Sequence, residues 1–392
     1  MKTSEIVLIQ LIGEQTIPNI LPVNRLKPQK VYNLCTDKTE HEGLRINRWI
    51  ANKFLGNIRP HLKKLQGEDL YIATRRACEE LLTQHAGKRI IMNLTGGTKL
   101  MSLAMYQAAE TVADAMVIYI QSGQETFYHV KSAEWEDGFD WEGTPTEELS
   151  ITDLLEVSEQ KLVYGSIKDW RPCVAAARAV QQLADNISTE GLTTNISASN
   201  KNRKLLSRLR KACLQDPQLA KSFAAAGCVF TLNSAGETIN ASFLTGMWWE
   251  VLVADYLERT GNYREVLCSI QTYISEECGL TDVDVLATDG LTLTCFSCKR
   301  QLPKPDSEIN KHEARSRKLG GIHARKGIAV YHGNEDSYDK LKSLAKAAKM
   351  ECLIGTDVCP EIKIAPPVPP APAAPQDILM QGRDCSVESF LS

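Results

Sequence analysis

The sequence lacks the long apolar segments of membrane-spanning and exported proteins. A transmembrane helix needs about 20 mostly apolar residues in a row, and no stretch of the chain provides them. The apolar run near the N-terminus ends at Gly13 and is too short for a secretory signal. We therefore expect a cytoplasmic protein that makes no membrane contact.

Paired cysteine spacings are also missing, although the chain contains 12 cysteines. Their scattered positions do not form a disulfide framework and favour a reducing compartment. One CxxC pair exists, Cys295 and Cys298, but it falls on a predicted strand, where positions three apart point to opposite faces. The pair therefore does not predict a zinc site.

Charge is unevenly distributed along a chain that is long enough for two or three domains. The chain has 392 residues, 43% of them hydrophobic, and a net charge of −3. Residues 132–160 carry ten acids and no Lys or Arg, whereas residues 201–211 carry six bases and no acid. Residues 299–326 carry nine Lys or Arg against three acids. This asymmetry predicts that a polyanion binds in the second half, although solvated helix faces produce similar runs.

The first 130 residues alternate between strand and helix patterns. Four apolar runs read as strands, at 6–12, 30–35, 89–94 and 115–120. Three helical patterns begin at Ile46, Ile72 and Leu100. Such alternation predicts a doubly wound, largely parallel sheet whose ligand site lies at the carboxyl ends of the strands.

Two loops lie at such strand ends. The first is Gly13-Glu14-Gln15-Thr16-Ile17-Pro18, and the second is Asn93-Leu94-Thr95-Gly96-Gly97-Thr98-Lys99, which opens a helix. The second loop combines hydroxyls, a lysine and a helix N-terminus with glycines that let backbone N–H groups approach a ligand, so it predicts a phosphate cradle. Its spacing matches neither G-x-x-x-x-G-K-[ST] nor G-x-G-x-x-G, and a tight turn capped by threonine is the alternative.

The pattern between residues 152 and 241 is mainly helical. An apolar stripe of Leu205, Leu206, Leu209 and Cys213 is surrounded by the bases of residues 201–211. This suits a small winged-helix-like or linker domain with a basic helix, and a solvated surface helix is the alternative. The Pro/Ala-rich segment 360–375 predicts polyproline II or disorder, and we assign it no chemistry.

A predicted hairpin gathers acids and a lysine. A two-residue turn at Asp289-Gly290 would pair Thr288 with Leu291, placing Asp284 opposite Cys295 and Asp282 opposite Ser297. Side chains alternate along each strand, so Asp282, Asp284, Ser297 and Lys299 would share one face of the hairpin. Val283, Val285, Phe296 and Cys298 would share the other. Two acids and a lysine so placed can hold a divalent cation, as metal-assisted phosphodiester cleavage requires. An exposed polar face on an ordinary hairpin is the alternative.

The residues around this hairpin predict a second α/β unit. Residues 246–257 read as a buried helix in which Glu250 lies close to two tryptophans. A carboxylate there needs a partner, for which a metal is suitable, and a capping or rim role is the alternative. Helices are predicted at 307–318 and 341–349, and strands at 327–331 and 351–354.

The ordered set of motifs resembles the CRISPR ancillary nucleases of type III systems. The set is Asn93 to Lys99, Gly246-x-x-x-Glu250, Asp282-Val-Asp284, Ser297-Cys-Lys299 and Gly320-Gly321. This resemblance implies an α/β chain with a Rossmann-like CARF sensor domain (1–150), a small winged-helix-like connector (151–241), a PD-(D/E)XK, restriction-endonuclease-like domain (242–359) and a Pro/Ala-rich linker and tail (360–392). It also implies a homodimer that binds cyclic tetra-adenylate and then cuts single-stranded DNA, RNA or both with Mn²⁺ or Mg²⁺. Nicking of duplex DNA is left open.

The resemblance also assigns roles to individual residues. Ligand binding falls to Gly13, Glu14, Gln15, Thr36, Thr95, Gly96, Gly97, Thr98 and Lys99. Catalysis falls to Glu250, Asp284, Ser297 and Lys299. Metal binding falls to Asp284, Asp282, Glu250 and the carbonyl of Cys298.

Ser297 departs from the family pattern, which usually places Asp or Glu at this position. A hard divalent ion prefers carboxylate oxygens but accepts hydroxyls, carbonyls and water, so we expect the metal chemistry to be retained. The missing carboxylate keeps a second hypothesis open, a catalytically weak regulator that senses the ligand and binds nucleic acid. A nucleotide-binding metabolic enzyme, suggested by the N-terminal half alone, ranks last.

Overall fold

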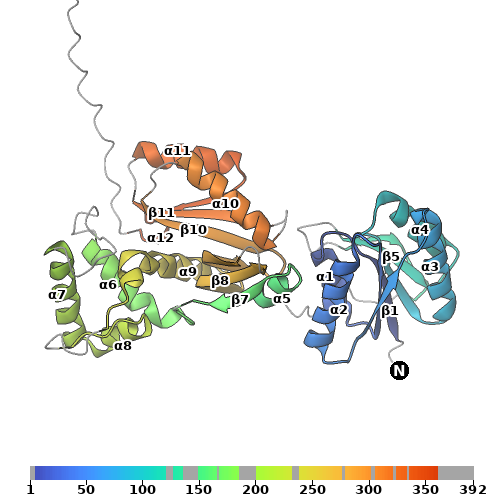
Figure 1. Cartoon of the computed structure of the whole chain (residues 1–392), viewed down its shortest axis with the longest axis horizontal. Coiled ribbons are helices and arrows are strands. Elements are labelled where there is room, and N and C mark those ends of the chain that lie inside the picture. The colour runs from blue at the N-terminus through green and yellow to red at the C-terminus, as the bar shows by residue number, and fades with distance from the viewer. Residues whose placement is uncertain are drawn as a thin grey trace, which may run out of the picture.

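The chain contains two six-stranded sheets, each at the centre of one lobe, and the lobes meet at helix α5 (Ile151–Glu156) (Figure 1). The computed structural model describes residues 5–120, 127–135, 149–165, 167–184, 200–231, 238–275, 279–301, 305–320, 324–332 and 335–360. Residues 136–148 of the acidic run, Gly321 of the predicted glycine pair and the chain after residue 360 lie outside these residues. Within them, no helix is both long enough and apolar enough to cross a bilayer.

The N-terminal sheet is doubly wound, as predicted, with the order β3-β2-β1-β4-β5-β6. Its strands are β1 (Ile6–Leu11), β2 (Lys30–Cys35), β3 (Arg59–Lys64), β4 (Arg89–Asn93), β5 (Ala115–Ile120) and β6 (Phe127–Lys131). All neighbours are parallel except β5 and β6. Because the chain runs from β1 to one side and from β4 to the other, the carboxyl ends of β1 and β4 flank a topological switch point, where ligands bind in such sheets.

Two helices cover each face of this sheet (Figure 1). They are α1 (Ile17–Leu26) with α2 (Glu40–Phe54), and α3 (Leu70–Gln84) with α4 (Lys99–Glu110). The sequence pattern did not predict α1, because it contains Pro18 in its first turn and Pro22 in its interior. It also missed β3, whose polar sequence lies at the edge of the sheet and shows no apolar run.

The C-terminal sheet is mixed, with the order β12-β11-β10-β9-β8-β7. Its strands are β7 (Lys161–Tyr164), β8 (Glu265–Ser275), β9 (Gly279–Thr288), β10 (Leu293–Gln301), β11 (Arg325–His332) and β12 (Glu351–Ile354). Strands β10 to β12 are parallel, and the other neighbours are antiparallel. Helices α10 (Pro305–Gly320) and α11 (Glu335–Ala347) pack on one face, and α9 (Trp248–Thr260) packs on the other.

The region predicted to be mainly helical also contributes a strand to this sheet. Residues 161–164 form β7, which pairs with β8 at the sheet edge. The remaining helical elements are a 3₁₀ turn (Arg171–Cys173), α6 (Val174–Ala184), α7 (Asn200–Gln215), α8 (Pro217–Ala225), a π-helical turn (Phe243–Met247) and α12 (Gly355–Val358). The predicted apolar stripe on α7 is confirmed, because Leu205, Leu209 and Cys213 are buried in the core cluster that contains α9.

The predicted two-residue turn at Asp289-Gly290 is wrong. Thr288 pairs with Leu293, so four residues connect β9 and β10. The Asp289 carboxylate closes this loop by accepting hydrogen bonds from the N–H groups of Leu291 (3.0 Å) and Thr292 (2.9 Å). The pairing therefore slips by two residues, and Leu286 rather than Asp284 lies opposite Cys295.

Strands β8 and β9 exchange their buried faces at Ser269 and Asp284. Cys268 and Val285 pack in the cluster around α9, whereas Ile270 and Val283, two positions further along, pack in the opposite cluster. Regular alternation predicts that Val283 and Val285 share a face of the sheet. In the structure they lie on opposite faces. The two carboxylate-bearing strands are irregular at the level of Asp284.

Candidate functional site

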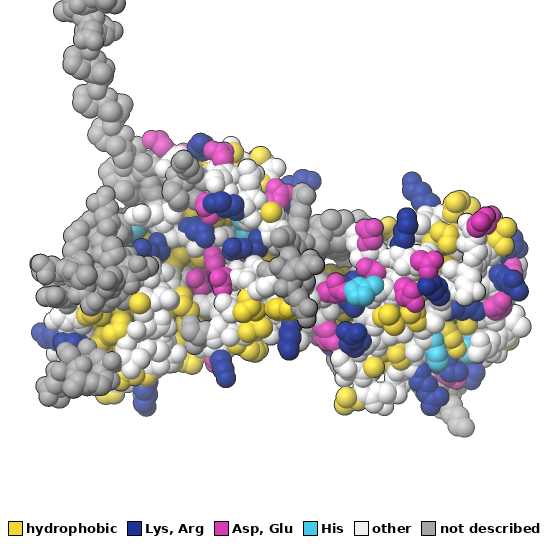
Figure 2. Space-filling model, in the orientation of Figure 1, with side chains coloured by type: hydrophobic (Ala, Val, Ile, Leu, Met, Phe, Trp, Pro, Cys, Tyr) yellow, Lys and Arg dark blue, Asp and Glu magenta, His cyan; other side chains and the backbone are white. Residues whose placement is uncertain are grey.

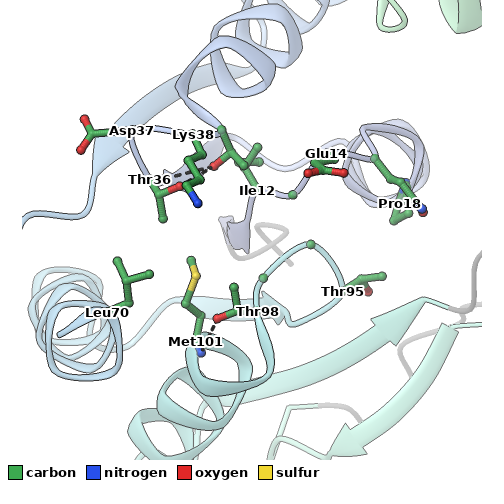
Figure 3. A pocket seen from close by; sticks show the side chains of 15 residues that line it. Ile12, Glu14, Pro18, Thr36, Asp37, Lys38, Leu70, Thr95, Thr98 and Met101 are labelled. Carbon is green, nitrogen blue, oxygen red and sulfur yellow. Dashed lines mark hydrogen bonds between the residues drawn. The ribbon is translucent and has the colours of Figure 1, made fainter. Parts of the chain in front are cut away.

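A cavity of about 630 Å³ lies at the carboxyl ends of β1, β2 and β4 (Figure 3). The loops after these strands supply residues 12–15, 36–39 and 95–98, while Leu70 and Met101 form the facing wall. This is the position that the doubly wound pattern predicts. Eight of the nine residues assigned to ligand binding line the cavity, and Lys99 does not.

Glycine is required where the first and third loops meet. A Cβ on Gly13 would lie 2.1 Å from the carbonyl oxygen of Gly96, and a Cβ on Gly96 would lie 2.1 Å from that of Leu11. No described residue accepts a hydrogen bond from the N–H of Gly96 or Gly97. Since both lie before the N-terminus of α4, these N–H groups provide a suitable cradle for an anion.

The hydroxyl of Thr95 is already engaged inside the protein. It donates to the Asn93 side-chain oxygen (2.7 Å) and accepts from the N–H of Ile120 (2.8 Å). The Asn93 amide in turn donates to the carbonyl of Pro18 (3.0 Å), which ties the loops after β1 and β4 together. Thr95 therefore lines the cavity, but its hydroxyl, which the sequence suggested as a ligand-binding group, stabilises the loop instead.

The cation in this cavity is Lys38, which the sequence analysis missed. Lys38 lies beside Thr36, and the neighbouring Asp37 points away and pairs with Lys64 at 2.5 Å (Figure 3). Lys99 is exposed at the first position of α4, outside the cavity lining. Lys38 carries a sequence signal of its own, because it follows a predicted parallel strand two residues after Thr36.

A second cavity, of about 600 Å³, lies in the C-terminal lobe and brings three predicted acids together. Glu250 comes from α9, and Asp282 and Asp284 come from β9. In Figure 2, Lys and Arg side chains gather over β10 and α10 beside an acidic patch near α9 and β8. Both charge signs therefore lie side by side on this face.

Asp284 is held by its Oδ2 atom. This oxygen accepts from the N–H of Cys298 (2.7 Å) and the Ser297 hydroxyl (3.4 Å), and it lies 3.7 Å from the Nζ of Lys299. Within the described part of the chain, Oδ1 has no hydrogen-bond partner. Cys298 thus contacts Asp284 through its N–H group, whereas the family resemblance assigned its carbonyl to the metal.

Glu250 lies in the first turn of α9, directly after the π-helical turn, a feature that is frequent at functional sites. Its Oε2 accepts a hydrogen bond from the hydroxyl of Ser269. Burial and the nearby Asp284 carboxylate raise the pKa of Glu250 to about 8, against the opposing effects of Ser269 and Lys299. Glu250 and Asp284 therefore behave as a close carboxylate pair.

Asp282 is more peripheral than the other two acids. It is exposed, and its Oδ1 accepts from the side-chain amide of Gln271 at 2.7 Å. It contributes the smallest of the effects that raise the pKa of Glu250.

The residues present fit a divalent ion with few protein ligands. No three His, Cys, Asp or Glu side chains among the described residues are arranged to hold a metal. However, Glu250 and Asp284 each keep one oxygen without a described partner beside an open cavity. Mg²⁺ is commonly held by one or two carboxylates, water and substrate phosphates, and this donor set matches that pattern.

Comparisons with known proteins support the architecture. Residues 7–149 match the family model described as the Card1 CARF domain, which agrees with the predicted Rossmann-like sensor domain. No curated protein matches the sequence.

Solved structures resemble both lobes. Protein VC1899 from Vibrio cholerae superposes with a TM-score of 0.64 at 13% identity, covering 90% of this chain and 95% of that one. Can2 from Sulfobacillus thermosulfidooxidans, solved with cyclic tetra-adenylate, gives 0.60 at 19% identity, with 89% and 95% covered. A type III CRISPR defence DNA nuclease activated by cyclic oligoadenylate gives 0.50 at 20% identity, with 85% and 47% covered. These likenesses establish a shared fold.

The pH dependence of stability tests the carboxylate pair. A carboxyl with a raised folded-state pKa stabilises the fold fully below its unfolded pKa and loses that contribution as pH rises through the folded pKa. In EDTA, unfolding free energy measured by urea titration should therefore fall between about pH 5 and pH 8, by up to about 1.4 kcal/mol per unit. Glu250→Gln should flatten this slope, and the exposed-site control Glu110→Gln should not. Equal slopes for wild type and Glu250→Gln would contradict the pairing.

Proposed function

We propose that this chain is a cyclic tetra-adenylate-activated, metal-dependent nuclease of type III CRISPR defence. Its substrate would be single-stranded DNA, RNA or both, with nicking of duplex DNA as a further activity. The observation that carries the proposal is that Glu250 and Asp284 line one cavity with Lys299 3.7 Å from Asp284, in a chain whose other lobe holds a pocket at a switch point.

The comparisons support this assignment. The N-terminal match is to a CARF domain, and the fold is shared with a protein solved with cyclic tetra-adenylate and with a nuclease activated by cyclic oligoadenylate. A ligand carrying four phosphates suits a pocket that offers the ammonium of Lys38 and the N–H groups of Gly96 and Gly97, for which the described residues provide no acceptor. We propose a homodimer, because a cyclic ligand with two-fold symmetry matches two copies that each supply one such pocket.

At the proposed active site, Glu250 and Asp284 would hold Mn²⁺ or Mg²⁺. When bound, such an ion polarises a phosphoryl oxygen and lowers the pKa of a water molecule. Lys299, whose Nζ lies 3.7 Å from Asp284, would orient the attacking water or offset charge on the scissile phosphate. Ser297 would keep Asp284 in place through its hydroxyl, which lies 3.4 Å from Oδ2.

The connection through α5 supports coupling between the two cavities. Next to Gln15 in the ligand pocket, Thr16 donates a buried hydrogen bond to the carbonyl of Val157 just after α5 (3.0 Å). From α2, Trp49 and Lys53 donate to Asp153 of α5 at 2.8 and 2.7 Å. The chain then continues directly into β7, whose last residue lines the carboxylate cavity. A displacement of the pocket loops would thus reach the active site through one short segment.

A second candidate function is a catalytically weak regulator that senses the ligand and binds nucleic acid. It is favoured by the serine at position 297 and by the lack of a three-residue metal cluster among the described side chains. The two functions differ in one result, since only the nuclease cleaves in response to the ligand.

Cleavage assays separate these functions. Labelled single- and double-stranded DNA and RNA are incubated with Mn²⁺ and with cyclic tri-, tetra- or hexa-adenylate. We expect cleavage that cyclic tetra-adenylate stimulates and EDTA abolishes. Asp284→Asn and Lys299→Ala should each lower the rate about 100-fold or more, because the first removes a metal-binding carboxylate and the second removes the cation that offsets charge on the scissile phosphate. The exposed Asp336→Asn on α11 is the control and should cleave normally. Near-normal cleavage by Asp284→Asn or Lys299→Ala would rule out this assignment.

Ligand binding tests the pocket separately from cleavage. Because Lys38 lines the cavity and Lys99 does not, Lys38→Ala should weaken binding of cyclic tetra-adenylate about tenfold or more, and Lys99→Ala by less. Calorimetric titration without metal measures both affinities. A larger loss in Lys99→Ala than in Lys38→Ala would show that the ligand contacts the exposed start of α4 instead.

A further inference from the structure

Ser269 has an unusual backbone for a residue inside a strand. Its φ angle is 50°, in the left-handed region that residues with a Cβ rarely adopt. Four other non-glycine residues in the described ranges have positive φ, namely Lys27, Leu55, Glu159 and Lys349, and each lies in a turn after a helix. Such a conformation persists only where the surroundings enforce it, and it is concentrated at functional sites.

The position of Ser269 explains where its side chain points. It lies between the paired positions Cys268–Val285 and Ile270–Val283, which places it across from Asp284. At this point the strand exchanges its buried faces, because Cys268 and Ile270 pack in different clusters. The hydroxyl consequently reaches Glu250 and donates to its Oε2.

Gly165 lies close to the backbone of Ser269. It follows β7, and a Cβ at this position would lie 2.0 Å from the carbonyl oxygen of Ser269. Only a residue without a side chain allows this approach. Tyr164, Gly165, Ser269 and Glu250 all line the same cavity.

We propose that Ser269 is a positioning residue, which fixes the Glu250 carboxylate beside Asp284 for binding a divalent ion, and that Gly165 enforces its backbone. This inference rests on the proposed metal site and adds two residues that the hairpin motif does not include. Hydrogen bonds from neighbouring residues orient metal-binding carboxylates, and their loss typically weakens metal affinity about 10- to 100-fold.

Substitutions at Ser269 separate the hydroxyl from the backbone. Ser269→Ala removes the donor, and Ser269→Gly removes it while relieving the strained φ. Ser269→Asn keeps a donor in a residue that tolerates the left-handed region. Ser242→Ala is the matched control, because Ser242 lines the same cavity and Glu250 accepts its hydrogen bond from Ser269 instead.

The first readout is the Mn²⁺ dissociation constant, measured by calorimetry without substrate, and the second is the Mn²⁺ concentration for half-maximal cleavage with cyclic tetra-adenylate. Both should rise about tenfold or more in Ser269→Ala and Ser269→Gly, with affinity for cyclic tetra-adenylate unchanged. Ser269→Asn should recover most of the binding, and Ser242→Ala should match wild type. Gly165→Ala should reproduce the loss, since its added Cβ must displace Ser269.

The outcomes distinguish this inference from the proposed function. Wild-type Mn²⁺ affinity in Ser269→Ala would overturn the positioning role, even if the wild type cleaves as expected. Recovery by Ser269→Gly would also overturn it, because the backbone alone would then matter. A wild type that binds Mn²⁺ but never cleaves would refute the proposed nuclease activity. The Mn²⁺ affinities of the variants would still decide the positioning role of Ser269. A wild type that binds no Mn²⁺ would overturn both.

Discussion

The carboxylates of Glu250 and Asp284 lie at one cavity in the C-terminal lobe. Their mutual repulsion and the burial of Glu250 are the electrostatic constraint that the neighbouring residues must offset. Burial and the charge of Asp284 raise the pKa of Glu250 to about 8, so the pair needs a proton or a cation to be stable. Lys299 offsets part of this charge at 3.7 Å from Asp284. Each carboxylate keeps one oxygen without a described partner beside the cavity, where the proposed divalent ion and phosphate would complete the site.

The same region is joined to the N-terminal lobe by packing as well as by sequence. Leu154 and Leu155 of α5 share one buried cluster with Trp49 from the N-terminal lobe and with Leu286 and Leu319 from the C-terminal lobe. A segment packed against both lobes cannot move relative to one without disturbing the other. This gives a physical basis for the proposed control of cleavage by a ligand in the N-terminal pocket.

The sequence predicted the elements that carry strong patterns. Alternating apolar runs gave the doubly wound sheet and placed Gly13, Thr36 and Thr95 at one pocket, because parallel strand ends converge. The sequence pattern did not predict β7, which lies in a stretch with a mainly helical pattern. It predicted a two-residue turn after Thr288 because Asp289-Gly290 is a common hairpin signal, whereas the loop has four residues. The role of Ser269 has no sequence signal, since it depends on a backbone angle and on contact with a distant glycine.

The most direct test is whether the carboxylate pair exchanges a proton for an ion. Mn²⁺ is titrated calorimetrically near pH 7 into protein loaded with cyclic tetra-adenylate, in two buffers of different ionisation enthalpy. Since the pKa of Glu250 is about 8, its carboxyl carries a proton under these conditions and must lose it to bind the ion. We predict release of about one proton per ion from the wild type and almost none from Glu250→Gln. Mn²⁺ binding without proton release, or no binding at all, would contradict a metal site built on Glu250 and Asp284.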